Sequence, residues 1–237
     1  MNAITTKTAV DKLEFPSGLT VSTLLAFTAG FVDTCGFIML FGLFTAHVTG
    51  NFVLIGASLA ESRPGIYAKL LAFPAFVIVV AITRLYLIRC ERRQRDATRS
   101  ILVAQMTFLA LFLATGVLAS PIRDADTPLA ILIGFFGVTA MAIQNAASRT
   151  IFAAHAPTTV MTGNVTQVVM DLVELPLRGD ATQTKARLHK MVPPVIGFTA
   201  GAIASGLAVA WVGFWSLLCP LLVTAFVCVA YRRSTTP

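Results

Sequence analysis

Residues 45–56 read TAHVTGNFVLIG, and residues 158–169 read TTVMTGNVTQVV. The two stretches share a leading threonine, a Thr-Gly-Asn tripeptide and, beyond them, a leucine and a glutamate: Thr45 with Thr158, Thr49-Gly50-Asn51 with Thr162-Gly163-Asn164, Leu59 with Leu172 and Glu61 with Glu174. This correspondence predicts an internal duplication. In each copy the tripeptide, called here the Thr-Gly-Asn motif, precedes a short apolar segment. A polar motif repeated in apolar surroundings indicates a binding site.

The composition is that of an integral membrane protein. Hydrophobic residues make up 56% of the chain and charged residues only 12%, whereas a soluble domain is about a quarter charged. The mean hydropathy is +0.80. At about 20 apolar residues per crossing, a chain of 237 residues has room for roughly six to eight helices. We therefore expect an all-α fold, one membrane domain over residues 1–237, and no soluble domain.

The net charge of +7 is distributed in the way that fixes orientation in a membrane. Basic residues gather between apolar runs, above all in residues 89–95, which read RCERRQR, and in the loop expected at residues 174–190. Such clusters mark the cytoplasmic side. The expected partner is therefore a lipid bilayer and not nucleic acid. Residues 1–18 precede the first apolar run without a small-residue cleavage site, so we expect a cytoplasmic N-terminal segment and no removable signal peptide.

Six apolar runs are long enough to cross a bilayer, at residues 19–43, 66–88, 101–119, 129–147, 192–212 and 214–231. The segments after the motifs, 51–60 and 165–173, are too short to cross about 30 Å at about 1.5 Å per residue. If they are re-entrant or broken helices, the chain has about six spans, both termini are cytoplasmic, and the halves 19–119 and 127–231 form an inverted repeat. If they cross, about eight helices form a parallel repeat.

The Thr-Gly-Asn motifs are expected to line a cavity, because irregular backbone survives in hydrocarbon only where protein or water covers it. The glycines permit tight turns, and the threonines and asparagines can cap the short helices. Two helix N-termini with free amides then meet near the membrane midplane and favour an anion or a polar solute. The candidate solute-binding residues are therefore Thr49, Gly50, Asn51, Thr162, Gly163 and Asn164. The alternative is structural, with the motifs serving only capping and close packing.

Asp33 lies near the middle of the first apolar run. A carboxylate there costs at least a few kcal/mol, and such residues usually belong to an ion or proton path. Its counterpart in the second half, to within one residue, is Asn145, and Asn145 and Gln144 join the candidate solute site. His47 has Val160 as its counterpart and is either a polar wall residue or a proton relay. Asp33 and His47 are thus the candidates for proton or ion coupling; the alternative is a protonated Asp33 that locks two helices together.

The sequence predicts no metal site, no cofactor and no enzymatic activity. It contains no nucleophile elbow, phosphate loop or zinc-protease motif. The three histidines are dispersed. The cysteines lack the spacing of a zinc or redox site and are expected to be packing residues: Cys35, Cys90, Cys219 and Cys228.

The motifs carry a family resemblance. Residues 30–37 read GFVDTCGF and are followed by HVTGN at residues 47–51, and Gln144-Asn145 is followed by TTVMTGN at residues 158–164. This pattern resembles the YoaK-like family of bacterial multi-pass membrane proteins, which is named for a domain of unknown function, and the similarity covers residues 19–231. The resemblance implies a bacterial cytoplasmic membrane and about six helices. It implies no substrate.

These observations favour a small permease, proton-coupled or facilitative, that binds a small polar or anionic solute between the two motifs. A passive channel and a non-transporting scaffold or sensor are the alternatives. The sequence leaves open the solute, the direction of transport and whether the protein is a homo-oligomer.

Overall fold

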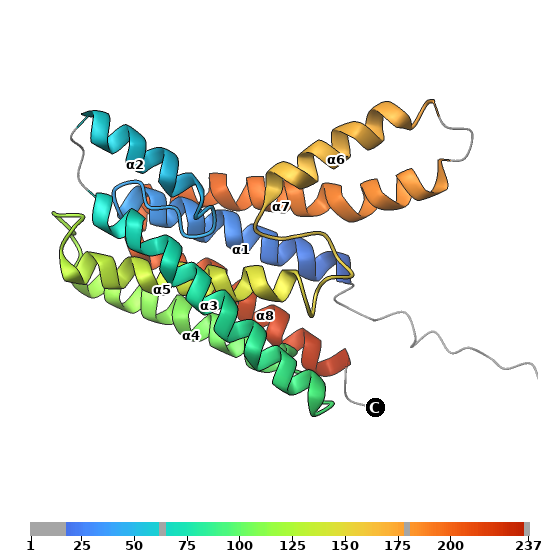
Figure 1. The fold of residues 1–237 in the computed structure, drawn as a ribbon, viewed down its shortest axis with the longest axis horizontal. Helices are drawn as coiled ribbons and strands as arrows, with labels where there is room; N and C mark the ends of the chain where they lie inside the picture. The colour runs from blue at the N-terminus through green and yellow to red at the C-terminus, as the bar shows by residue number, and fades with distance from the viewer. Residues whose placement is uncertain (1–17, 62–64, 178–180, 235–237) are drawn as a thin grey trace, which may run out of the picture.

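The computed structural model describes residues 18–61, 65–177 and 181–234. Every regular element in these ranges is helical (Figure 1). The α-helices are, in chain order, α1 (Gly18–Met39), α2 (Gly50–Glu61), α3 (Ile66–Arg92), α4 (Thr98–Ala119), α5 (Pro128–Ser148), α6 (Met161–Glu174), α7 (Thr182–Val212) and α8 (Leu218–Ser234). A short 3-10 helix, η2 (Gly213–Leu217), joins α7 to α8.

Five helical stretches among the described residues are long and apolar enough to cross a membrane. They are Leu19–Met39, Ile66–Arg92, Thr98–Ala119, Pro128–Ser148 and Thr182–Tyr231, and the last contains α7, η2 and nearly all of α8. The prediction of an all-α membrane fold is therefore confirmed. The helices that carry the motifs are short, as expected, with 12 residues in α2 and 14 in α6.

The most extensive helix pair is α1 with α7, and glycines set its spacing. A Cβ atom on Gly30 of α1 would lie 2.2 Å from the backbone oxygen of Phe198. A Cβ atom on Gly201 of α7 would lie 2.1 Å from the backbone oxygen of Phe27, and a Cβ atom on Gly197 would also collide with a backbone oxygen of α1. Helices in lipid associate through such close backbone approach, because burying apolar surface yields little there. The two helices run side by side across the molecule (Figure 1).

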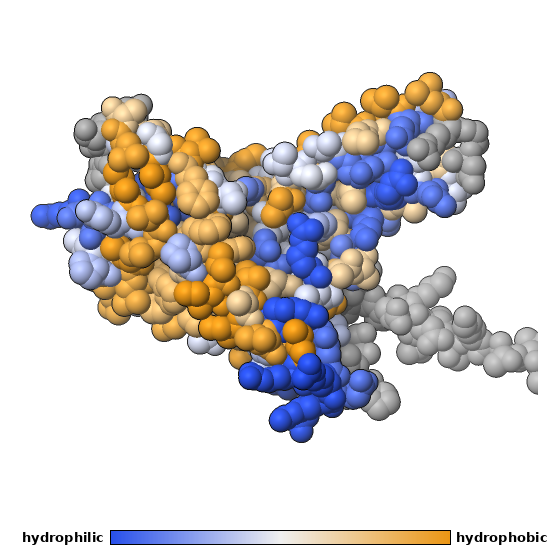
Figure 2. All heavy atoms as spheres, in the orientation of Figure 1, coloured by the Kyte–Doolittle hydropathy of each residue, from blue (hydrophilic) through white to orange (hydrophobic). Residues whose placement is uncertain are grey.

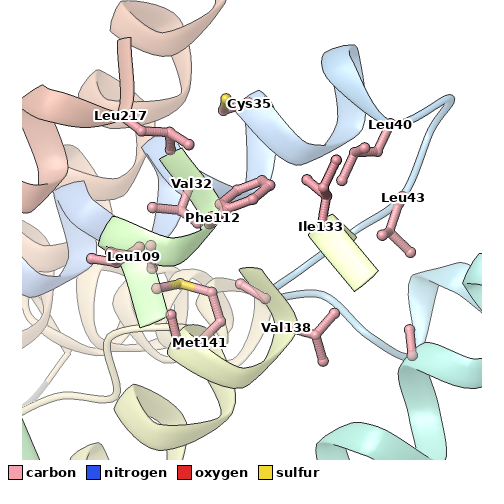
Figure 3. Close-up of a cluster of buried hydrophobic side chains, with 14 of the residues drawn as sticks. Val32, Cys35, Leu40, Leu43, Leu109, Phe112, Ile133, Val138, Met141 and Leu217 are labelled. Carbon is pink, nitrogen blue, oxygen red and sulfur yellow. The ribbon is translucent and has the colours of Figure 1, made fainter. Parts of the chain in front are cut away.

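The larger apolar core lies between α1, α4, α5 and η2 (Figure 3). Val32 and Cys35 of α1 belong to it, together with Phe112 of α4 and Leu217 of η2, and all four are fully buried. The Phe112 ring packs edge-on against Phe214, with 5.7 Å between the ring centroids. Cys35 acts here as a small apolar residue. It and the other three cysteines are unpaired.

The expected loop at residues 174–190 is wrong in its second half. Helix α7 already begins at Thr182, and it continues through Pro193 and Pro194. The reason is tertiary, because α6 packs on the first turns of α7. Arg187 of α7 donates to the fully buried Asp171 of α6, from Nη2 to Oδ1 at 2.6 Å and from Nε to Oδ1 and Oδ2 at 3.0 and 3.1 Å. This ion pair stabilises the first turns of α7, whose basic residues had led to the prediction of a loop.

Candidate functional site

Asp33 joins α1 to the loop that precedes α2. Its Oδ1 accepts hydrogen bonds from the backbone amides of Thr45 at 2.8 Å and Ala46 at 2.7 Å. Its Oδ2 lies 2.6 Å from Nδ1 of His47. The side chain is only 5% exposed, so one buried carboxylate fixes the conformation of the loop and the orientation of the imidazole. Asp33 and His47, predicted separately, are thus one pair.

The chain reverses direction immediately after α1. Phe41 and Gly42 have positive φ angles of 53° and 83°, a backbone conformation that favours glycine. Lys69 of α3 donates from Nζ to the backbone oxygen of Phe41 at 2.9 Å and so supports this turn. The expectation of a tight turn is wrong for Gly163, which lies inside α6, whereas Gly50 is the first residue of α2 and its amide closes a turn onto the carbonyl of His47 at 2.8 Å.

The His47 side chain is 34% exposed and faces a pocket of about 540 Å³, called here the Asp33–His47 pocket. Its ring packs edge-on against Phe198 of α7, with 5.4 Å between the centroids. Four of the predicted site residues line this pocket, and the complete lining is Asp33, Thr34, Phe37, Phe44, His47, Thr49, Gly50 and Phe198. The sequence did not single out the aromatic residues, because phenylalanine is common throughout the chain.

The amides at the start of α2 are not free. Those of Gly50, Asn51 and Phe52 donate to the carbonyls three residues earlier in the chain, at 2.8, 3.2 and 3.2 Å. The loop thus enters the helix through tight turns that use the amide groups. The expectation of free helix-end amides pointing at a solute is therefore wrong for α2, and the polar groups of this pocket are side chains.

Gln144 of α5 joins elements of both halves. Its Nε2 donates to the backbone oxygen of Leu25 at 2.7 Å and to Oγ1 of Thr158 at 3.0 Å. Its Oε1 accepts from Nε2 of Gln105 at 2.7 Å. Gln105 was not predicted as a site residue, although a glutamine within an apolar run is itself a signal. Because its polar atoms are bonded within the protein, Gln144 fixes the loop before α6.

Asn145 lies within one residue of the place in the second half that Asp33 has in the first. Its Nδ2 donates to Oγ1 of Thr159 at 2.7 Å, across a separation of 14 residues. Asp33 and His47 are also 14 residues apart. Each half therefore has a polar residue of a long helix bonded to the loop before the short helix. The first pair contains an acid and an imidazole, and the second contains an amide and a hydroxyl.

The two motif asparagines fasten the loops that precede their own helices. Asn51 accepts from the amide of Phe44 and donates to the carbonyl of the same residue, both at 2.9 Å. Asn164 donates to the carbonyl of Pro157 at 2.8 Å. In both copies the bonded residue is seven positions earlier, and Asn164 lacks the second bond because proline has no amide hydrogen. The side-chain amides of Asn51 and Asn164 therefore form hydrogen bonds with backbone groups of the loops that precede their helices.

This difference gives a stability prediction. Asn51→Ala removes two largely buried hydrogen bonds to the backbone and is expected to destabilise the protein by about 2 kcal/mol. Asn164→Ala removes one backbone bond and a weak 3.7 Å contact with Sδ of Met161, and is expected to cost about 1 kcal/mol. Thermal unfolding of the purified full-length variants in detergent micelles measures both. Thr162→Ala, at an exposed position in the same motif, is the control and should change little. An equal loss at the two asparagines would contradict the hydrogen-bond pattern.

The structure does not bring the two motifs into one pocket. Both short helices begin near the middle of the molecule and diverge toward opposite ends (Figure 1). Helix α2 packs on α3 and α6 packs on α7, and no contact joins α2 to α6. The remaining predicted residues do not line the Asp33–His47 pocket: Asn51, Gln144, Asn145, Thr162, Gly163 and Asn164. Thr162 and Gly163 lie on the exposed surface of α6.

Comparison with known proteins identifies the family. The family model described as "Protein of unknown function (DUF1275)" matches residues 21–230. The UPF0700 transmembrane protein YoaK of Bacillus subtilis (strain 168) is 29% identical over 154 residues, which cover 65% of this chain and 66% of that protein. No solved structure matches the chain. The resemblance stated from the motifs is confirmed: the chain belongs to the DUF1275 family and is a multi-pass membrane protein of the YoaK-like kind.

Proposed function

We propose that the protein is a small-solute permease, either proton-coupled or facilitative, whose solute enters the Asp33–His47 pocket. The observation that carries the proposal is the hydrogen-bonded pair of Asp33 and His47 in the wall of a pocket of about 540 Å³. A carboxylate buried in a membrane protein usually marks an ion or proton path. Both residues line the pocket, and the imidazole is the more exposed of the two side chains.

The pocket has the chemistry of a site for a small polar or anionic solute. Nδ1 of His47 is engaged by Asp33, so Nε2 is the ring nitrogen that a solute can contact. The exposed Thr49 beside it adds a hydroxyl group. Phe37, Phe44 and Phe198 line the same pocket with aromatic rings. A few convergent polar groups in a largely apolar lining are typical of small-molecule sites.

Proton coupling follows from the net charge of the pair. When the imidazole carries a second proton, Asp33 and His47 are together neutral, and when it releases that proton they are together negative. An anionic solute next to His47 is therefore bound more tightly in the protonated state. Because linkage is reciprocal, bound solute also favours proton binding. This mutual dependence is what a proton-coupled permease requires.

The proposal includes a topology of about six crossings, in which α7 and α8 are separate spans and α2 and α6 are re-entrant. Gly213, with a φ angle of 54°, and η2 separate α7 from α8. At about 1.5 Å per residue, α2 and α6 are shorter than about 30 Å of hydrocarbon. Both termini and the arginine-rich end of α3 are then cytoplasmic in a bacterial inner membrane. The equivalent bonds of Asn51 and Asn164 support an internal repeat, and with three crossings in each half that repeat is inverted.

The experiment is uptake into liposomes that contain the purified full-length protein and a pH-sensitive dye. Acetate, phosphate, glycine and glycerol serve as probes, each added outside with a matched control in protein-free vesicles. We expect at least one probe to enter at least tenfold faster with the protein. If the permease is proton-coupled, Asp33→Asn abolishes the pH change that accompanies solute entry. If it is facilitative, entry through the wild-type protein gives no pH signal, and His47→Gln slows that entry.

Thr166→Ala is the matched control for these variants. It alters an exposed threonine of α6 whose hydroxyl bonds only to its own helix, at 2.9 Å from the carbonyl of Thr162, and it should transport like the wild type. Entry of every probe at the protein-free rate would overturn the permease proposal. Flux that persists in Asp33→Asn with altered selectivity would instead identify a passive channel.

A non-transporting scaffold is the second candidate, and one observation favours it. The side-chain amides of Asn51, Gln144, Asn145 and Asn164 all bond within the protein, as the structural interpretation of the motifs requires. A scaffold would show no solute entry for any probe, and no probe would raise its unfolding temperature. Stabilisation by a probe that is lost in His47→Gln would exclude this second candidate.

A further inference from the structure

A crevice of about 610 Å³ runs between α3, α4 and α5. Helices α3 and α4 both pack against α5, but their backbones do not approach each other, so a space stays open between them. Its lining is almost entirely apolar and includes Ile78 and Ile82 of α3, Ile101 and Phe108 of α4, and Phe135 of α5. We call this space the apolar crevice. None of the residues predicted from the sequence as a site lies in it.

A second pocket, of about 540 Å³, adjoins the crevice at the C-terminal end of α3. Tyr86 and Ser100 line both spaces, and Tyr86 donates a hydrogen bond to Ser100 at 2.7 Å where they meet. The second pocket, called here the arginine pocket, holds four arginine side chains: Arg89, Arg93, Arg95 and Arg99. Figure 2 shows hydrophilic residues gathered over this end of α3, directly beside hydrophobic surface.

The positive charge of the arginine pocket is not neutralised within the described residues. Asp96 is the one acid in its lining, and that carboxylate accepts hydrogen bonds from the amide and hydroxyl of Thr98, at 2.9 and 2.7 Å. The nearby Glu91 pairs instead with Arg84, at 2.7 Å. The lining therefore contains four arginines and one carboxylate that already accepts two hydrogen bonds, and an anion is the complementary ligand.

We propose that the apolar crevice and the arginine pocket together bind one anionic phospholipid, with the phosphate at the arginines and an acyl chain between α3 and α4. Arginine forms paired hydrogen bonds with phosphate, and basic pockets between membrane helices bind phosphate headgroups. Tyr86 lies at the boundary between the two environments, as tyrosine does at membrane interfaces. Basic residues that only set the orientation of the chain in the membrane do not need a crevice beside them. The arginine pocket and the apolar crevice together therefore indicate a ligand with a charged part and an apolar part.

The test is lipid binding to the purified full-length protein in detergent, measured by native mass spectrometry. We expect phosphatidylglycerol to bind at least tenfold more tightly than phosphatidylcholine with the same acyl chains. The double variant Arg89→Gln/Arg99→Gln should weaken phosphatidylglycerol binding about 25-fold, because each basic residue near an anionic lipid contributes roughly a factor of five. Arg123→Gln/Lys185→Gln removes the same charge at exposed positions outside the pocket, and it should leave binding within about twofold.

The apolar half is tested separately. Ala104, in the wall of the crevice, is changed to phenylalanine to fill it, and Ile82→Ser makes the exposed wall polar if Ala104→Phe does not fold. Either change should weaken phosphatidylglycerol binding at least fivefold. Equal binding of both phospholipids, or an effect of the control variant as large as that of Arg89→Gln/Arg99→Gln, would overturn the proposal. Competition by glycerol 3-phosphate at the same concentration as the lipid would also overturn it, because the site would then be one for a free anion.

Discussion

Gly201→Ala is expected to destabilise the protein by about 3 kcal/mol or more, at the upper end of the range for overpacking. The added Cβ atom would lie 2.1 Å from the backbone oxygen of Phe27 and 2.9 Å from its carbonyl carbon. Backbone atoms in the middle of α1 cannot move aside without moving the helix. Helices α1 and α7, which form the most extensive helix pair of the structure, must then move apart. Thermal unfolding in detergent micelles, followed by circular dichroism, measures the loss.

The same helix provides a control of opposite sign. Gly206 of α7 has open space where a Cβ atom would lie, so Gly206→Ala adds a methyl group without a clash. In a helix interior alanine is favoured over glycine by up to about 1 kcal/mol, and this variant should be neutral or slightly stabilised. Gly30→Ala, which meets Phe198 at 2.2 Å, should be destabilised like Gly201→Ala. Similar unfolding of Gly201→Ala and Gly206→Ala would contradict the close packing of α1 on α7.

Asp33→Ala is expected to destabilise the protein by about 3 to 5 kcal/mol. The change leaves the amides of Thr45 and Ala46 without their acceptor, and both residues are buried. An unsatisfied buried donor costs about 1 to 3 kcal/mol, and the imidazole of His47 loses its partner as well. The loop before α2 is then no longer fastened to α1. Thermal unfolding measures the loss, and proteolysis of the loop between α1 and α2 should become faster.

Asp33→Asn separates the hydrogen bonds from the charge. The amide oxygen can still accept from Thr45 and Ala46, so this variant should keep most of its stability while the negative charge next to His47 disappears. It is therefore the variant suited to uptake measurements. If Asp33→Asn unfolds as readily as Asp33→Ala, the pair with His47, and not the fastening of the loop amides, is the main contribution of this carboxylate.

The helices could be predicted from the sequence because their cause is local. Long apolar runs in this chain have no stable alternative to helix in a bilayer, where each backbone amide must be bonded within its own segment. The runs near residues 66–88 and 129–147 accordingly appear as α3 and α5, a few residues longer. The short segments after the motifs are short helices for the same reason. The boundary of α7 was missed because its first turns are polar and rest on α6.

The candidate site was predictable only in part. The intramembrane position of Asp33 singled it out, because an acid in an apolar run is costly without a role or a partner. That His47 is its partner follows from the turn at Phe41 and Gly42, which folds the loop back onto α1. Duplication of the motifs suggested a shared site for Asn51 and Asn164, yet each amide fastens its own loop. Duplication preserves structural bonds as well as functional ones.

The sequence by itself determined that this is an all-helical membrane protein with two short helices, and that Asp33 is exceptional. Apolar content and segment length decide those points, and neither depends on which helices become neighbours. Only the tertiary structure decided the partners: His47 for Asp33, Gln105 for Gln144, and the crevice beside the arginines of α3. A polar group in hydrocarbon must find a partner, but the packing of elements distant in the chain selects which one.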